Sequence, residues 1–152
     1  MTDSPTSHIP RAPLLLGLAG LLPFLWAALG ILLPAVSDAT VAALGPRFNA
    51  PYMLIAYGTV ILCFMSGVLW GFAVKSDRFL PYLVSTLPAL WAFFAIGGGE
   101  RQATSAVLVG FLLVFLFDIQ FSVWRLTPAW WLKLRALLTA IVLACLAIGL
   151  FA

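Results

Sequence analysis

Charged residues are scarce in this sequence. Only 9% of its 152 residues are Asp, Glu, Lys or Arg, where an ordinary soluble domain carries roughly 25%. Hydrophobic residues make up 64% of the chain, which leaves too few polar side chains to cover a water-soluble globule. The eight Lys and Arg residues are scattered and form no basic stripe, so the net charge of +3 does not indicate nucleic acid as a partner. Lipid must be the main solvent of this protein, and the lipid bilayer is its first expected partner.

Histidine and cysteine are scarce as well. The single histidine, His8, lies in a polar N-terminal stretch, and Cys63 and Cys145 lie inside apolar runs, where we expect small buried thiols. The apolar runs therefore lack histidine ligands for a membrane haem, for copper or zinc and for di-iron clusters. They also lack a Ser/His/Asp or Cys/His set for nucleophilic catalysis. We expect no cofactor and no metal site, and a protein that is not an enzyme.

Long apolar runs are what the sequence has in quantity. An α-helix needs about 20 apolar residues to cross the hydrocarbon core of a bilayer. Five runs approach or exceed that length, broken by charges or by Pro and Gly, and they span residues 13–33, 52–74, 80–96, 104–124 and 128–151. The sequence predicts an all-α polytopic membrane protein. A polar cytoplasmic tail (1–12) precedes a single domain of five transmembrane helices (13–152).

The positions of Lys and Arg predict the orientation of this bundle. Cytoplasmic loops retain positive charge. Six of the eight basic residues fall on the N-terminal side of the predicted membrane, namely Arg11, Lys75, Arg78, Arg125, Lys133 and Arg135. Only Arg47 and Arg101 fall on the other side. With five helices, this count places the N-terminus in the cytoplasm and the C-terminus outside.

Asp118 is the most informative single residue, because a carboxylate inside a membrane helix needs a partner. The fourth and fifth runs are joined near Leu126 and Thr127, and residues equally distant from such a turn lie at equal depth in two antiparallel helices. Arg135 is as far from the turn as Asp118 is. We predict an ion pair between them that locks a helical hairpin. The functional alternative is a proton relay or an anchor for a ligand.

The start of the fifth helix is also marked in the sequence. Thr127 has the side chain of an N-cap and Pro128 suits the first helical position. The face predicted to meet the fourth helix carries Pro128, Trp131, Arg135 and Thr139. On the fourth helix, Ser122 lies one turn beyond Asp118 on the same face.

The second apolar run has one face of small and weakly polar residues. They are Thr59, Cys63, Ser66, Gly67, Trp70 and Gly71. Gly67 and Gly71 form a small-xxx-small pair, which lets another helix approach closely. We predict that this face packs within the bundle, and a homodimer face or a ligand pocket are the alternatives. The opposite face, predicted to meet lipid, carries Ile61, Met65, Val68, Leu69 and Phe72.

Two sets of residues carry a resemblance to a known family. The first set is Tyr57, Gly58, Val60, Ile61, Leu62, Phe64, Gly67, Trp70 and Gly71. The second is Pro128, Trp130, Leu134, Arg135, Leu138 and Thr139, preceded by Asp118. From Arg11 onward the chain resembles the domain of unknown function 3429 family, the transmembrane protein 69-like multi-pass membrane proteins. It departs from the family pattern at Ser66, where a second glycine is expected, and at Trp131, where tyrosine is frequent.

The resemblance implies a multi-pass protein of the bacterial inner membrane, or of the mitochondrial inner membrane in a eukaryote. It implies no established activity. It also implies a shared backbone contact at Gly58, which the helical pattern alone does not explain.

Three hypotheses about function follow. The first is a non-enzymatic accessory or assembly partner of a membrane complex, with a membrane protein or a second copy of the chain as its partner. The second is a binder or transporter of a small molecule, lipid or quinone, with an inner-leaflet pocket lined by Ser66, Trp70, Asp118 and Arg135. The third is a proton-coupled role for Asp118.

Overall fold

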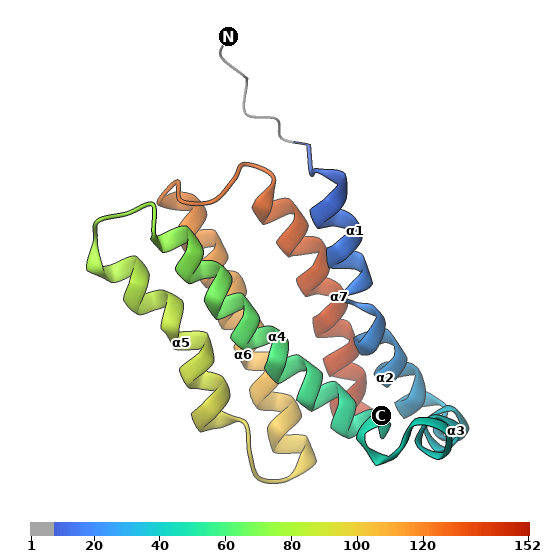
Figure 1. Cartoon of the computed structure of the whole chain (residues 1–152). Helices are drawn as coiled ribbons and strands as arrows, with labels where there is room; N and C mark the ends of the chain where they lie inside the picture. Colours follow the sequence, from blue (N-terminus) through green and yellow to red (C-terminus); the bar gives the residue numbers. More distant parts are fainter. Residues whose placement is uncertain (1–7) are drawn as a thin grey trace.

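The computed structural model of the chain describes residues 8–152, and the first seven residues of the predicted tail lie outside that range. Every regular element in the described part is helical. The elements are α1 (Arg11–Ala19), α2 (Leu22–Leu32), α3 (Pro34–Leu44), a 3-10 turn (Pro46–Phe48), α4 (Ala50–Ala73), α5 (Phe79–Ala95), α6 (Glu100–Val123) and α7 (Trp131–Phe151) (Figure 1). The predicted all-α class is confirmed.

Four helical stretches are long and apolar enough to cross a membrane. They are α1 and α2 taken together (Arg11–Leu32), α4, α6 and α7. Helix α5 is equally apolar in character but has 17 residues, fewer than a perpendicular span requires. The chain is therefore a membrane protein, with four candidate spans and one shorter apolar helix.

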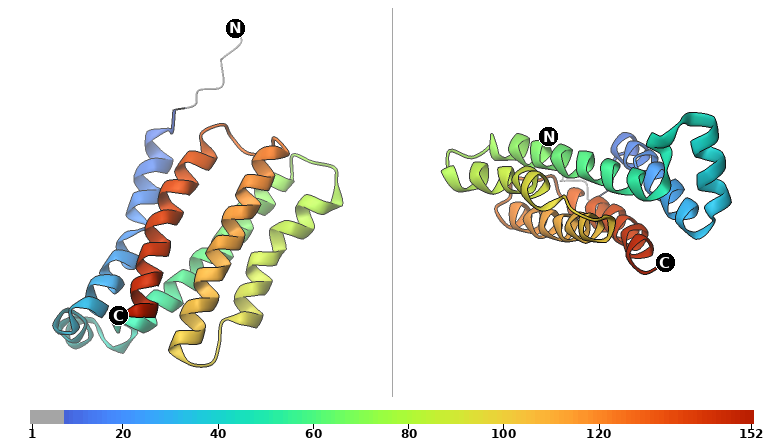
Figure 2. Two further views of the ribbon diagram at one scale, coloured as in Figure 1. Left: turned by 180° about the vertical axis from the view of Figure 1, so that it is seen from behind. Right: turned by 90° about the horizontal axis from the view of Figure 1, so that it is seen from below.

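The helices form two layers, with α4 and α5 in one and α6 and α7 in the other, while α1 and α2 close one edge (Figure 2). Helix α4 packs against α2, α5 and α6, and α7 packs against α6 and α2. The N-terminal end of α1, the loop before α5 and the loop before α7 lie at one end of the bundle. Helix α3, the loop before α6 and the C-terminus lie at the other (Figure 1).

The first apolar run is broken, where the sequence predicts one helix. Helix α1 ends at Ala19 and α2 begins at Leu22. Pro23 has no backbone N–H to donate to the turn before it, which weakens the helix at this point. The hydroxyl of Tyr57 on α4 donates to the carbonyl of Gly20 at 3.0 Å, so a carbonyl exposed by the break has a partner. The break thus depends on a contact from another helix, which no local pattern reveals.

The start of α7 also differs from the prediction. The helix begins at Trp131 and its cap makes no side-chain hydrogen bond, so the assignment of Thr127 as N-cap and Pro128 as first residue is wrong. The Thr127 hydroxyl instead shares a 2.9 Å hydrogen bond with Ser122 at the end of α6. Arg125, with φ of 59°, turns the chain sharply after α6. The link after α6 is therefore bonded to the last turn of α6. Helix α7 begins about one turn after Thr127.

The buried face of α4 contains residues that the sequence assigns to lipid. Met65 and Leu69 are 4% and 0% exposed, which contradicts that assignment. Large flexible and branched aliphatic side chains fill the space between helices, and their volume decides which face is inside. Hydrophobicity does not decide it in a membrane, because lipid is as apolar as the core.

The predicted packing face of α4 is largely on the outside. Cys63, Gly67, Trp70 and Gly71 are exposed, and a Cβ atom added to either glycine would meet nothing within 4 Å. The prediction that this face packs within the bundle is wrong for Cys63, Gly67 and Gly71, while the half-exposed Trp70 contacts α5 at its edge. Ser66, at the margin of the same face, is buried.

Gly58 is one point of close approach between α4 and α6. A Cβ atom added there would lie 2.7 Å from Cγ1 of Val107, a residue that is 0% exposed. Val107 is β-branched and stiff in a helix, so it cannot move aside at low cost. The absence of a side chain at Gly58 therefore sets the spacing of two central helices, as the family resemblance implies.

We expect Gly58→Ala to lower the free energy of unfolding by about 1–3 kcal/mol, because the added methyl group overpacks this contact. Gly67→Ala is the matched control, since it adds the same methyl group to the same helix where no atom lies within 4 Å. Both variants gain the same helix propensity, so their difference isolates the clash. Unfolding curves in mild detergent give the comparison, and equal stability of the two variants would contradict the close approach.

Candidate functional site

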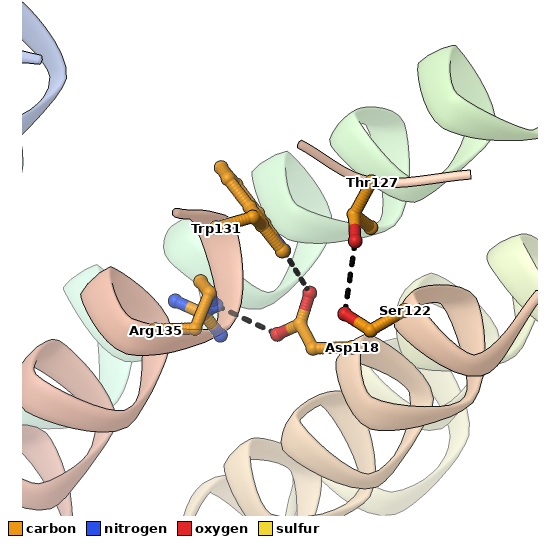
Figure 3. Close-up of polar contacts among 5 residues, drawn as sticks. All are labelled: Asp118, Ser122, Thr127, Trp131 and Arg135. Atoms are coloured by element: carbon orange, nitrogen blue, oxygen red, sulfur yellow. Dashed lines mark hydrogen bonds and ion pairs between the residues drawn. The ribbon is translucent and has the colours of Figure 1, made fainter. Parts of the chain in front are cut away.

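Asp118 and Arg135 form an ion pair in the interior of the bundle. Nε of Arg135 lies 2.7 Å from Oδ2 of Asp118 and donates a hydrogen bond to it (Figure 3). The two residues are 0% and 5% exposed. The structure therefore brings together the two charged residues that the sequence places at equal depth in the α6–α7 hairpin.

A third side chain completes the surroundings of the carboxylate. Nε1 of Trp131 donates to Oδ1 of Asp118 at 2.7 Å, so each carboxylate oxygen accepts one charge-assisted hydrogen bond (Figure 3). Trp131 and Arg135 are four residues apart on α7, which places them on one face of that helix. The Ser122–Thr127 bond lies beside this group and ties the same hairpin nearer its turn.

Two buried polar atoms of α7, one in Arg135 and one a turn further on in Thr139, have no hydrogen-bond partner among the described residues. Nη2 of Arg135 and Oγ1 of Thr139 are buried, and neither makes a hydrogen bond within the described part of the chain. Arginine has five N–H donors, and a buried donor without an acceptor loses its hydration with no compensation. The carboxylate is thus satisfied while the guanidinium retains unused hydrogen-bonding capacity.

A cavity of about 340 Å³ lies beside the guanidinium, between α1, α2, α4 and α7. Its volume falls in the range of small-molecule sites. It is lined by Pro13, Leu16, Gly17, Gly20, Leu21, Phe24, Ile61, Phe64, Met65, Val68, Phe111, Trp131, Leu134, Arg135, Leu138 and Val142. Among the residues that the structure describes, Arg135 is the one charged residue in this lining. The arrangement can hold an apolar molecule and offer it one buried group of hydrogen-bond donors.

The cavity differs from the pocket predicted by the sequence, which has Ser66, Trp70, Asp118 and Arg135 as its lining. Of these four only Arg135 borders it. The hydroxyl of Ser66 instead donates to the carbonyl of Ser85 and joins α4 to α5. Ser66 therefore contributes to the packing of α4 against α5, at the turn of α5 that precedes its internal Pro88.

The remaining small and polar residues of α4 are also placed away from the cavity. The Thr59 hydroxyl donates to the carbonyl of Ile55 in its own helix, at 2.8 Å. Trp70 contacts Tyr82 of α5 edge to face, with 5.1 Å between ring centroids, and is 48% exposed. The first contact lies within α4 and the second joins α4 to α5. Neither contact involves the ion pair.

Sequence reasoning misses the wall of the cavity that α1 and α2 supply. Gly17 and Gly20 both border the cavity. A Cβ atom added to Gly17 would lie 2.8 Å from Cδ1 of Leu138 on α7. The two glycines in an otherwise apolar run are the signal that could have indicated close packing there.

Within residues 8–152, no group of three or more His, Cys, Asp or Glu side chains could hold a metal ion. Cys63 and Cys145 are both free thiols, and of these only Cys145 is buried as predicted.

Comparison with known proteins shows a family and a curated relative to which this chain is similar. The pattern of the family described as Protein of unknown function (DUF3429) matches residues 9–151. Transmembrane protein 69 of Xenopus tropicalis is 34% identical over 142 residues, which is 87% of this chain and 51% of that protein. The chain thus spans about half the length of this curated relative. No solved structure matches the chain significantly.

We expect Asp118→Asn and Arg135→Gln each to lower the free energy of unfolding by about 3–5 kcal/mol, because each leaves a buried polar partner uncompensated. The double variant should lose less than the two single losses added together, by about 2 kcal/mol. The control pair is Asp77→Asn with Arg101→Gln, two exposed residues at opposite ends of the bundle, for which the losses should add. Additive losses for Asp118 and Arg135 would contradict the pairing.

Proposed function

The chain belongs to the family described as Protein of unknown function (DUF3429), and from that premise we propose that it is a non-enzymatic membrane protein that binds an amphipathic small molecule or lipid of the bilayer. The observation that carries this proposal is the apolar cavity of about 340 Å³ with the buried, incompletely bonded guanidinium of Arg135 in its wall. An apolar cavity with a few convergent polar groups is the usual form of a binding site.

The exposure of two residues at the edge of the cavity supports a ligand that enters from the membrane. Leu16 of α1 and Phe64 of α4 both border the cavity, and they are 73% and 63% exposed. The cavity therefore opens sideways between α1 and α4, on the outer surface of the bundle that lipid covers. A molecule with an apolar tail can enter there from the bilayer.

The ion pair supports a binding role over a relay. A proton relay through a membrane needs a succession of titratable groups. Both oxygens of Asp118 already accept hydrogen bonds from Arg135 and Trp131. Asp118 does not border the cavity. We therefore propose that Asp118 positions Arg135, and that Arg135 is the group that meets the ligand.

We also propose five membrane spans, with α5 as the short one, in the inner membrane of a bacterium or of a mitochondrion. The end of the bundle that carries the N-terminal helix and the loops before α5 and α7 then lies in the cytoplasm or matrix (Figure 1). Six of the eight basic residues belong to that end, which is the arrangement that the positive-inside rule describes. The cavity then lies in the inner leaflet.

This orientation predicts the labelling of two cysteine variants in the loops at either end of α5. In intact bacterial cells expressing the protein, a membrane-impermeant maleimide should label Gly97→Cys, whereas Asp77→Cys should react only after the cells are permeabilised. The unaltered protein is the control for Cys63 and Cys145, which lie within the helices. Labelling of Asp77→Cys in intact cells would reverse the orientation, and labelling of both variants would remove α5 as a span.

An accessory role in a membrane complex is the second candidate, and one observation favours it. Gly67 and Gly71 form a small-xxx-small pair on the outside of α4, where no residue of the described chain approaches within 4 Å of an added Cβ atom. Small residues of this spacing let a second helix pack closely in lipid. A membrane-protein partner or another copy of the chain could use this face.

Purification from membranes in mild detergent, followed by mass spectrometry of small molecules and proteins, tests both candidates. We expect the unaltered protein to retain an amphipathic molecule and Val68→Phe to lose it, because Val68 borders the cavity. Val60→Phe is the matched control, since Val60 is 60% exposed on the same helix.

Recovery of a stoichiometric second membrane protein without a bound small molecule would favour the accessory role instead. Recovery of the protein alone, with neither, would contradict both candidates.

A further inference from the structure

We infer that the molecule held in the cavity is an uncharged amphiphile whose carbonyl oxygen accepts a hydrogen bond from Arg135. This inference rests on the proposed binding function and adds the chemical class of the ligand. It follows from three properties of the site, which are the donors left unused, the net charge and the shape of the lining.

The group of Arg135 that has no partner is a hydrogen-bond donor, so the ligand must supply a hydrogen-bond acceptor. Nε of Arg135 is engaged by Asp118, whereas its Nη2 is buried without a partner. The carboxylate has one bond on each oxygen and does not border the cavity. Among the described residues that line the cavity, Arg135 is therefore the one with a buried N–H donor that has no acceptor of its own.

The charge of the site favours an uncharged acceptor. Asp118 and Arg135 neutralise one another, at 0% and 5% exposure. No other charged residue borders the cavity among those that the structure describes. A bound carboxylate or phosphate would bring an uncompensated negative charge into a medium of low dielectric constant, which is expensive. A carbonyl oxygen satisfies the free N–H without adding charge.

The lining fits a flat headgroup followed by an apolar tail. The aromatic residues Phe24, Phe111 and Trp131 line the cavity together with Arg135. A dry apolar cavity of roughly 150 Å³ already accommodates a benzene ring, so about 340 Å³ leaves room for a substituted ring or an ester group with the first part of its chain. The remainder of the tail can leave through the opening between Leu16 and Phe64. A quinone headgroup and the acyl ester of a lipid share this chemistry.

Four probes with the same decyl tail separate these possibilities. They are a decyl-substituted benzoquinone, the decyl ester of acetic acid, decyl sulfonate and decane itself. Each is titrated against the full-length protein in an uncharged detergent, and the rise of the thermal unfolding midpoint with probe concentration gives its dissociation constant.

We expect the quinone, the ester or both to bind about tenfold more tightly than the sulfonate and the alkane, because one hydrogen bond to a buried charged group is gained without a new charge. Binding of the quinone alone would identify a quinone headgroup, and binding of the ester alone would identify a lipid ester. Arg135→Lys, which retains the charge opposite Asp118 but lacks the outer guanidinium nitrogens, should reduce this preference.

Val68→Phe should abolish binding of every probe, whereas Val60→Phe should not. Equal or tighter binding of the sulfonate or the alkane, sensitive to Val68→Phe, would overturn the inference and leave the proposed function in place. Absence of any midpoint shift with all four probes would overturn both. The comparison of probes on the unaltered protein decides the matter even if Arg135→Lys does not fold.

Discussion

The buried ion pair between Asp118 and Arg135 is the constraint on which the rest of this structure depends. An isolated charge in the hydrocarbon region is costly, so neither residue is tolerated there without the other. Their 2.7 Å contact fixes the register of α6 against α7, and Trp131 secures the second carboxylate oxygen. Arg135 also borders the cavity, and Nη2 of its guanidinium is buried without a hydrogen-bond partner among the described residues. One interaction thus stabilises the hairpin and presents a polar group to an otherwise apolar space.

The remaining helices surround this cavity. Their positions depend on close contacts between helices and on the break between α1 and α2. Gly58 brings α4 close to α6, and Gly17 brings α1 close to α7. The interruption between Ala19 and Leu22 changes the course of the first span beside the cavity, with Tyr57 bonded to the carbonyl of Gly20. The cavity borders two exposed residues, Leu16 of α1 and Phe64 of α4, and we propose that a molecule from the lipid phase enters between them.

Sequence reasoning recovers the parts of this architecture that obey rules of length, charge and depth. The apolar runs locate every long helix to within a few residues, and the equal distance of Asp118 and Arg135 from the turn predicts their contact. It fails for the faces of α4, since in lipid both faces are apolar and only side-chain volume separates Met65 from Gly67. It also fails for the break at Gly20 and for the wall that α1 and α2 contribute, because both depend on contacts between helices distant in sequence.

We propose that Arg135, held by Asp118, meets a ligand in the cavity. A structure of the protein determined in lipid nanodiscs, at a resolution that shows bound lipids, would reveal whether the cavity is occupied. We expect density for an apolar molecule between α1, α4 and α7, with a polar atom within hydrogen-bond reach of Nη2 of Arg135. A cavity filled by the protein's own side chains, with that nitrogen bonded to a carbonyl of the chain, would contradict it.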